Sequence, residues 1–90
     1  MAKSLKDKVA EAINEAVAGK VAHLELEDVS GDKVQGLVLS DAFAGQSASE
    51  RQDHIWKYLD AHLSQFERTR IVFIVTDTPE EYAELKKAAG

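Results

Sequence analysis

Apolar residues in the first part of the chain recur every four positions, the spacing of one face of an amphipathic helix. The repeat runs through residues 4–18 and is carried by Leu5, Val9, Ile13 and Val17. Ser4 suits the N-cap, and Gly19 suits the position after the C-terminus, where a left-handed backbone is common. The pattern therefore predicts a helix that packs one apolar stripe against a core.

The next two segments alternate between apolar and polar residues, as strands with one covered face do. Residues 22–28 place leucines on one side and acidic residues on the other, and residues 34–40 form a second run. Residues 30–33 form a turn between them, which predicts an antiparallel hairpin. Gly36 marks either a bulge or a close backbone approach. We interpret the acidic side of residues 22–28 as a solvated face, because alternate carboxylates alone do not make a coordination shell.

Small residues dominate a loop at 41–49, in which Phe43 is the only large apolar residue. Phe43 is expected to plug the core, and ligand stacking is the alternative. Ser47 and Glu50 have capping-box spacing and start a second long helix that extends to about residue 63. Its expected buried stripe consists of Ile55, Leu59 and Leu63, with Trp56 and Phe66 along the edge.

The run Ile71–Val75 is entirely apolar and mostly β-branched, which favours a strand over a helix. A strand without a polar side is usually central in a sheet or covered on both faces, and we expect this run to be the central strand against which the other elements pack. Residues 78–81 read Thr-Pro-Glu-Glu, a strong helix start with a cap, a first-turn proline and a reciprocal glutamate. The last helix should reach about Ala88, with Tyr82 and Leu85 facing inward.

The predicted fold is α+β, with the order α-β-β-α-β-α in a single domain, residues 1–90. The second strand, the long helix and the third strand form a crossover, which should be right-handed and give a parallel pair. We expect a three-stranded mixed sheet with the helices packed largely on one face.

Composition excludes several function classes. The chain has no cysteine, so it has no disulfide, thiolate metal site or thiol nucleophile. Eleven basic against sixteen acidic residues give a net charge of −5, which disfavours binding to a phosphate backbone. No apolar run approaches the ~20 residues of a membrane span, and the N-terminus lacks a signal-peptide pattern. We expect a cytoplasmic protein.

The residues that carry chemistry do not form a catalytic pattern. His54 and His62 lie two helical turns apart, about 12 Å, which is too far for one metal. There is no G-x-S-x-G elbow, and no glycine loop has a nucleotide-binding spacing. We therefore predict a protein that is not an enzyme and has no metal site of its own. A pocket that gathers Asp77, His54 and Arg70 would revive the enzyme alternative.

Three segments, in order, resemble the BolA-like family. Residues 39–45, Leu-Ser-Asp-Ala-Phe-Ala-Gly, are similar to the family's serine, phenylalanine and glycine after the second strand. Arg51 and the helix residues 55–59 follow. Residues 76–82, Thr-Asp-Thr-Pro-Glu-Glu-Tyr, are similar to the family's threonine-proline-glutamate-aromatic ending. The resemblance covers about half of the chain, and a third strand at the margin of the sheet would count against it.

The resemblance implies a fold related to the type II KH arrangement, and a stress- or iron-linked protein that pairs with monothiol glutaredoxins. In that family the pair shares a [2Fe-2S] cluster, and a histidine at the entry to the third strand supplies one ligand. Arg70 stands at that position here, and arginine offers no lone pair to iron. The family's Arg-His pair reads Arg51-Gln52, and residues 30–33 contain neither His nor Cys. We therefore expect no cofactor held by this chain.

The leading hypothesis is a non-enzymatic interaction domain, with a monothiol glutaredoxin as the family-implied partner. The expected partner-binding residues are Phe43, Gly45, Arg51, His54 and Arg70. His54 is the histidine nearest in sequence to the altered Arg-His pair, and Arg70 is suited to pair with a carboxylate or phosphate of the partner. The alternative is weak nucleic-acid binding through an arginine patch of Arg51, Arg68 and Arg70, although the G-x-x-G loop of KH domains is absent.

Overall fold

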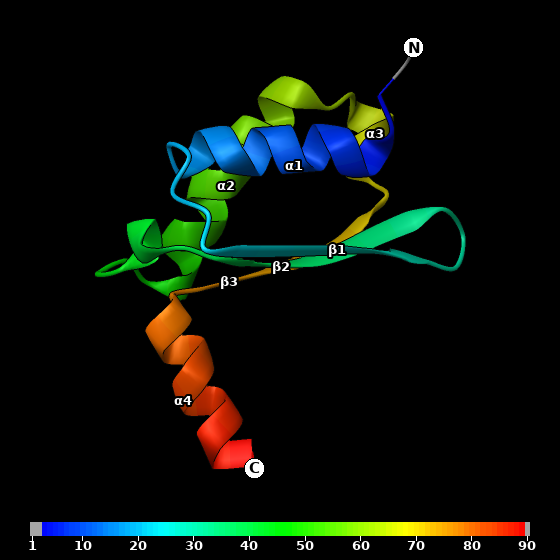
Figure 1. The fold of residues 1–90 in the computed structure, drawn as a ribbon. Coiled ribbons are helices and arrows are strands. Elements are labelled where there is room, and N and C mark those ends of the chain that lie inside the picture. The colour runs from blue at the N-terminus through cyan, green and yellow to red at the C-terminus, as the bar shows by residue number, and fades with distance from the viewer. Residues whose placement is uncertain (1–2, 90) are drawn as a thin grey trace.

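The computed structural model describes residues 3–89, so residues 1–2 and 90 of the expected domain lie outside the description. Its elements are α1 (Leu5–Ala16), β1 (His23–Val29), β2 (Lys33–Leu39), the 3₁₀ turn η1 (Asp41–Phe43), α2 (Ala48–His62), α3 (Gln65–Arg68), β3 (Ile71–Asp77) and α4 (Pro79–Ala89) (Figure 1). The predicted order α-β-β-α-β-α is confirmed, with α3 added between α2 and β3.

Each α-helix begins at a reciprocal capping box. A serine or threonine side chain accepts the backbone N–H three residues on, and an acidic side chain at that position accepts the backbone N–H of the cap. The pairs are Ser4–Asp7, Ser47–Glu50, Ser64–Glu67 and Thr78–Glu81. The boxes at Ser47 and Thr78 confirm the prediction. The box at Ser64 was not predicted, and it places Phe66 in α3, where its side chain is 71% exposed instead of lying along α2.

The strands are ordered β1-β2-β3, so β2 is central and β3 is an edge strand. The prediction that Ile71–Val75 forms the central strand is therefore wrong. The predicted pairings are confirmed: β1 with β2 antiparallel and β2 with β3 parallel. Both pairings use β2, and the strand with two partners must be the inner one. The all-apolar run identified a strand but not its place in the sheet.

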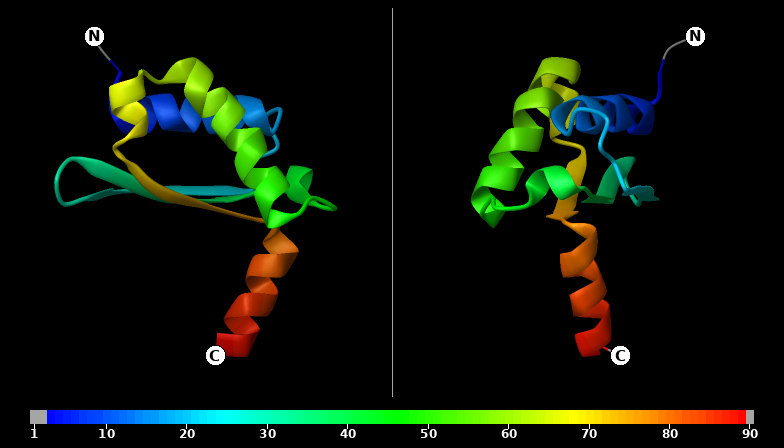
Figure 2. Two further views of the ribbon diagram at one scale, coloured as in Figure 1. Left: turned by 180° about the vertical axis from the view of Figure 1, so that it is seen from behind. Right: turned by 60° about the vertical axis from the view of Figure 1, so that its left-hand side comes forward.

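Helices α1 and α2 cover one face of the sheet, and α4 leaves the end of β3 on the opposite side (Figures 1 and 2). The core between the sheet and the two helices consists of Val9, Ala12, Ile13, Ala16, Val17, Val38, Phe43, Ile55, Leu59, Leu63, Ile71 and Ile74. Because α4 stands away from this core, Leu85 is 59% exposed, and the prediction that it faces inward is wrong. Tyr82, one turn earlier, is partly buried.

Gly36 marks a close approach of two strands. A Cβ at this position would lie 2.6 Å from Leu26 Cδ2 and 3.0 Å from the Glu25 carbonyl oxygen on β1. The close-approach alternative is therefore correct, while the register shift between β2 and β3 lies next to it, between Val34 and Gln35.

Candidate functional site

The expected partner-binding residues do not form one surface. Arg70 immediately precedes β3, whereas Arg51 contacts the Thr76 carbonyl oxygen near the other end of that strand, at 3.2 Å. Six residue steps along β3 separate Arg70 from Thr76, about 20 Å at roughly 3.3 Å per step. The structure therefore does not bring Arg51 and Arg70 into the single arginine patch that the nucleic-acid alternative requires.

Arg51 is a buried connector, only 7% exposed. Its guanidinium makes a bidentate pair with Glu81, with N–O distances of 2.6 and 2.9 Å, and its Nε donates to the Gln46 carbonyl oxygen at 3.0 Å. With the Thr76 contact, these bonds tie α2 to β3 and to the start of α4. The hydrogen bond from Arg51 is the main reason that the pKa of Glu81 falls to about 2. The charge of Arg51 is therefore used inside the fold.

Gln52, beside Arg51, has a similar structural role. Its side-chain nitrogen donates to the Ile74 carbonyl oxygen at 2.8 Å and to Thr76 Oγ1 at 3.2 Å. The family-like residues Arg51, Thr76 and Glu81 thus belong to one hydrogen-bonded network. These three residues connect α2, β3 and the start of α4.

In the loop that resembles the family, Phe43 and Gly45 support the fold and do not offer side chains to a partner. Phe43 is 1% exposed and packs in the core, which confirms the core-plug expectation and leaves its ring unavailable for ligand stacking. Gly45 has φ +80°, a left-handed backbone that glycine adopts at little cost. Its position is explained by the turn after η1.

The histidines are engaged in separate contacts. His54 Nε2 lies 2.7 Å from the Ala16 carbonyl oxygen, so that nitrogen carries a proton and donates, and its ring stacks with Tyr58. His62 pairs with Glu15, and His23 pairs with Glu25. Within residues 3–89, no three His, Asp or Glu side chains gather as a metal site would require.

Arg70 lies at the corner where β3 begins and the hairpin turns. Its Nε donates to the Asp32 carbonyl oxygen at 2.6 Å, and no salt bridge joins it to a carboxylate among residues 3–89. The residues at this corner do not suit a [2Fe-2S] cluster. The Arg70 guanidinium has no free lone pair to bind iron, and residues 30–33 contain no His or Cys. Asp77, His54 and Arg70 line three separate depressions and are not gathered in one pocket.

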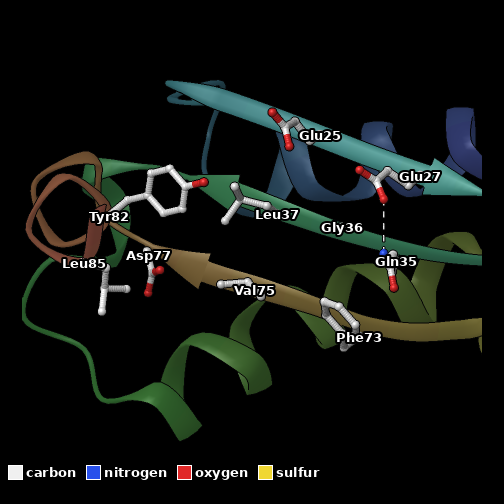
Figure 3. A pocket seen from close by; sticks show the side chains of 10 residues that line it. All are labelled: Glu25, Glu27, Gln35, Gly36, Leu37, Phe73, Val75, Asp77, Tyr82 and Leu85. Atoms are coloured by element: carbon white, nitrogen blue, oxygen red, sulfur yellow. Dashed lines mark hydrogen bonds between the residues drawn. The ribbon is translucent and has the colours of Figure 1, made fainter. Parts of the chain in front are cut away.

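A different feature stands out on the face of the sheet away from α1 and α2. There, a depression of about 310 Å³ lies in the corner between the sheet and α4 (Figure 3). Its apolar lining comes from Leu37, Phe73, Val75, Tyr82 and Leu85, and its polar lining from Glu25, Glu27, Gln35 and Asp77. We call this the open-face groove.

The strand register explains why the open-face groove has both acidic and apolar side chains. Glu25, Leu37 and Val75 are aligned across the three strands, and Glu27, Gln35 and Phe73 form the next row. Each row therefore carries a carboxylate on β1 and an apolar side chain on β3. Phe73 is 48% and Val75 is 40% exposed.

The apolar pattern of Ile71–Val75 did not predict this groove, because a run without a polar side favours a strand that is central or covered on both faces. The signal was nevertheless in the predicted pairings. A hairpin followed by a parallel crossover places the third strand at an edge, and the acidic side of β1 marks the face that remains in water. Taken together, those two observations predict an exposed apolar surface on β3.

Comparison with solved structures identifies the fold. The chain superposes on a Bol-like protein from Babesia bovis with TM-score 0.66 at 20% identity, covering 96% of this chain and 95% of that one. BolA1 from Arabidopsis thaliana gives 0.66 at 20% identity, covering 89% and 98%. The BolA domain of SufE1 from Arabidopsis thaliana gives 0.66 at 26% identity, covering 90% and 99%. Neither a protein-family model nor a curated protein matches the sequence.

These matches confirm the predicted fold and support the family resemblance, even though β3 lies at the margin of the sheet. The expectation that a marginal strand would count against the resemblance was itself mistaken. Among the helices of residues 3–89, none has the length and apolar character of a membrane span.

Proposed function

We propose, from the premise that this chain has the BolA-like fold, that it is an interaction domain that binds a protein partner and catalyses no reaction. The observation that carries this proposal is the uncovered apolar surface on β3 and α4, formed by Phe73, Val75 and Leu85. An exposed apolar surface of this kind on a small acidic domain is typical of a site that another molecule covers.

The partner we propose is a monothiol glutaredoxin, as the family resemblance implies. One structural neighbour is the BolA domain of SufE1, a domain of this fold within another protein, which supports a role as an interaction module. Arg70 has no carboxylate partner among residues 3–89 and is suited to pair with an acidic group of the glutaredoxin. In this proposal the chain supplies no ligand to an iron–sulfur cluster.

The test is co-purification with a monothiol glutaredoxin under anaerobic iron supply, read by binding and by visible absorbance. We expect a complex whose absorbance is the same for the wild type and for His54→Ala. Failure to recover glutaredoxin would remove this partner. A cluster band that disappears with His54→Ala would show that the chain does supply a ligand.

The nucleic-acid alternative is not favoured, because two of its three arginines already form ion pairs with carboxylates of this chain. Arg51 pairs with Glu81, and Arg68 pairs with Asp60 at 3.2 Å. In a low-salt fluorescence-anisotropy titration, we expect a labelled single-stranded RNA to show no salt-sensitive binding.

A further inference from the structure

We propose that the open-face groove binds a basic amphipathic helix of the partner, with apolar side chains on the floor and lysine or arginine beside Glu25 and Glu27. This inference rests on the proposed function and adds the docking surface and the chemistry of its occupant. It follows from the shape of the corner, the placement of its charges and the state of the strand edge.

The shape of the corner favours a rod that is apolar on one side. The side chains of Leu37, Phe73 and Val75 form its floor, and α4 forms a wall with Tyr82 and Leu85 (Figure 3). A helix about 10 Å across, packed on the sheet, would contact floor and wall together. The helix should be about 15 residues long, because at roughly 1.5 Å per residue it then matches a seven-residue strand such as β3.

The charges favour a basic occupant. The groove is lined by three carboxylates, Glu25, Glu27 and Asp77, and by no basic residue. Glu25 and Glu27 lie side by side on β1, so positive side chains are required along one flank of the bound helix. On α4, the Lys86 Nζ lies 4.9 Å from the centre of the Tyr82 ring and makes a cation–π contact with this wall residue.

The same charges disfavour a second copy of this chain as the occupant. Two copies that met through this face would bring their groove carboxylates together, and each chain already carries a net charge of −5. Burying like charges against one another suppresses such pairing. A basic partner removes the repulsion.

The edge of β3 disfavours binding by strand addition. Addition of a strand requires free backbone groups along the edge. On β3, the Ile74 carbonyl oxygen accepts a hydrogen bond from Gln52, and the Thr76 carbonyl oxygen accepts one from Arg51. With these acceptors occupied by α2, the face of the strand is the accessible part.

The direct test is a fluorescence titration with two labelled model peptides of about 15 residues. Both place leucine on one helical face, and the polar positions are lysine in one peptide and glutamate in the other. We expect the leucine–lysine peptide to bind the full chain and the leucine–glutamate peptide not to bind. Equal binding of the two peptides overturns the inference.

Variants locate the binding. The double variant Glu25→Lys/Glu27→Lys should weaken binding of the leucine–lysine peptide by roughly tenfold or more, about 1.4 kcal/mol. The matched control Asp53→Lys/Asp60→Lys makes the same charge change on exposed positions of α2 and should weaken it far less. Equal weakening by the two variants would mean that only bulk charge is measured, which overturns the inference.

The apolar floor is tested with Phe73→Ser/Val75→Ser, which should also reduce binding of the leucine–lysine peptide by roughly tenfold. If this variant does not fold, the charge variants still decide the outcome. Sedimentation of the wild-type chain alone should show a monomer. A dimer that Phe73→Ser disperses would establish a second copy as the occupant and overturn the inference.

The final arm uses glutaredoxin with the same two charge variants. If glutaredoxin binds the wild type and both variants equally, the proposed function stands and the open-face groove is not its docking surface. If glutaredoxin fails to bind any of them while the leucine–lysine peptide shows the expected pattern, the groove inference stands and the partner is wrong.

Discussion

The two faces of one strand differ in environment although their residue types are alike. On β3, Ile74 faces the core and is 3% exposed, whereas Val75, its neighbour, is 40% exposed in the open-face groove. Both are β-branched and aliphatic, so hydrophobicity alone does not say which side is covered. The difference comes from α1 and α2, which pack on one face only (Figure 2).

This contrast separates residues that hold the fold from residues available to a partner. The covered face should determine stability, and the open face should determine binding. The family-like residues fall mainly in the first group, because Arg51, Thr76 and Glu81 are bonded to one another.

Ile74→Ala and Val75→Ala should have very different effects on stability. Removing the buried side chain of Ile74 leaves a cavity and should reduce the free energy of unfolding by about 3 kcal/mol. Removing Val75 from the open face should cost about 0.5 kcal/mol. Urea unfolding measures both changes, and equal losses would show that β3 is covered on both sides, as the sequence pattern first indicated.

Arg51→Ala should destabilise the fold more than Arg68→Ala does. Without Arg51, the carbonyl oxygens of Gln46 and Thr76 lose a donor, and we expect a loss of about 2 kcal/mol. Arg68 makes a surface pair with Asp60, whose removal should cost about 0.5 kcal/mol or less. Unfolding free energies in urea compare the two. Near-equal values would mean that Arg51 is not the connector between α2 and α4.

The fold was predictable because its signals are local. Capping boxes, the alternation of β1 and the crossover rule fixed the element order and both strand pairings. What the sequence left open was the environment of each element. Leu85 has the spacing of an inward residue on α4, yet α4 has no core beneath it (Figure 1).

The candidate site was less predictable, because partner-binding residues were chosen for chemical type and for likeness to a family. Arg51 is a cation in the sequence, but Glu81, thirty residues away, uses that charge. His54 offers a ring nitrogen in the sequence, but the Ala16 carbonyl oxygen occupies it. Long-range partners of this kind follow from the three-dimensional packing and are not encoded in residue spacing.

Gly36→Ala should destabilise the sheet by about 1 kcal/mol, because the new methyl group overlaps Leu26 on β1. Shortening that neighbour should relieve part of the overlap. In a double-mutant cycle, Gly36→Ala should therefore cost less in the Leu26→Ala background than in the wild type. Additive losses would indicate that the Glu25 carbonyl oxygen, 3.0 Å away, is the main obstacle.

The smallest expected effect concerns acid stability at the junction of α2 and α4. The pKa of Glu81 is about 2 in the fold, chiefly through the hydrogen bond from Arg51, against an ordinary value of 4.5. Because the folded pKa is the lower one, the contribution of Glu81 is complete above pH 4.5 and is lost as the pH falls toward 2. Solvent screening keeps it modest, since the Glu81 side chain is 46% exposed.

Glu81→Gln preserves a capping side chain but removes the charge, so the variant should lose less stability than the wild type between pH 4.5 and 2. Glu84→Gln makes the same charge change one turn along α4, where no ion pair with Arg51 is formed among residues 3–89. It should retain the wild-type decline. Urea unfolding at a series of pH values measures the slopes. If Glu81→Gln and Glu84→Gln gave the same slope, the Arg51–Glu81 pair would not be the source of the acid sensitivity at this junction.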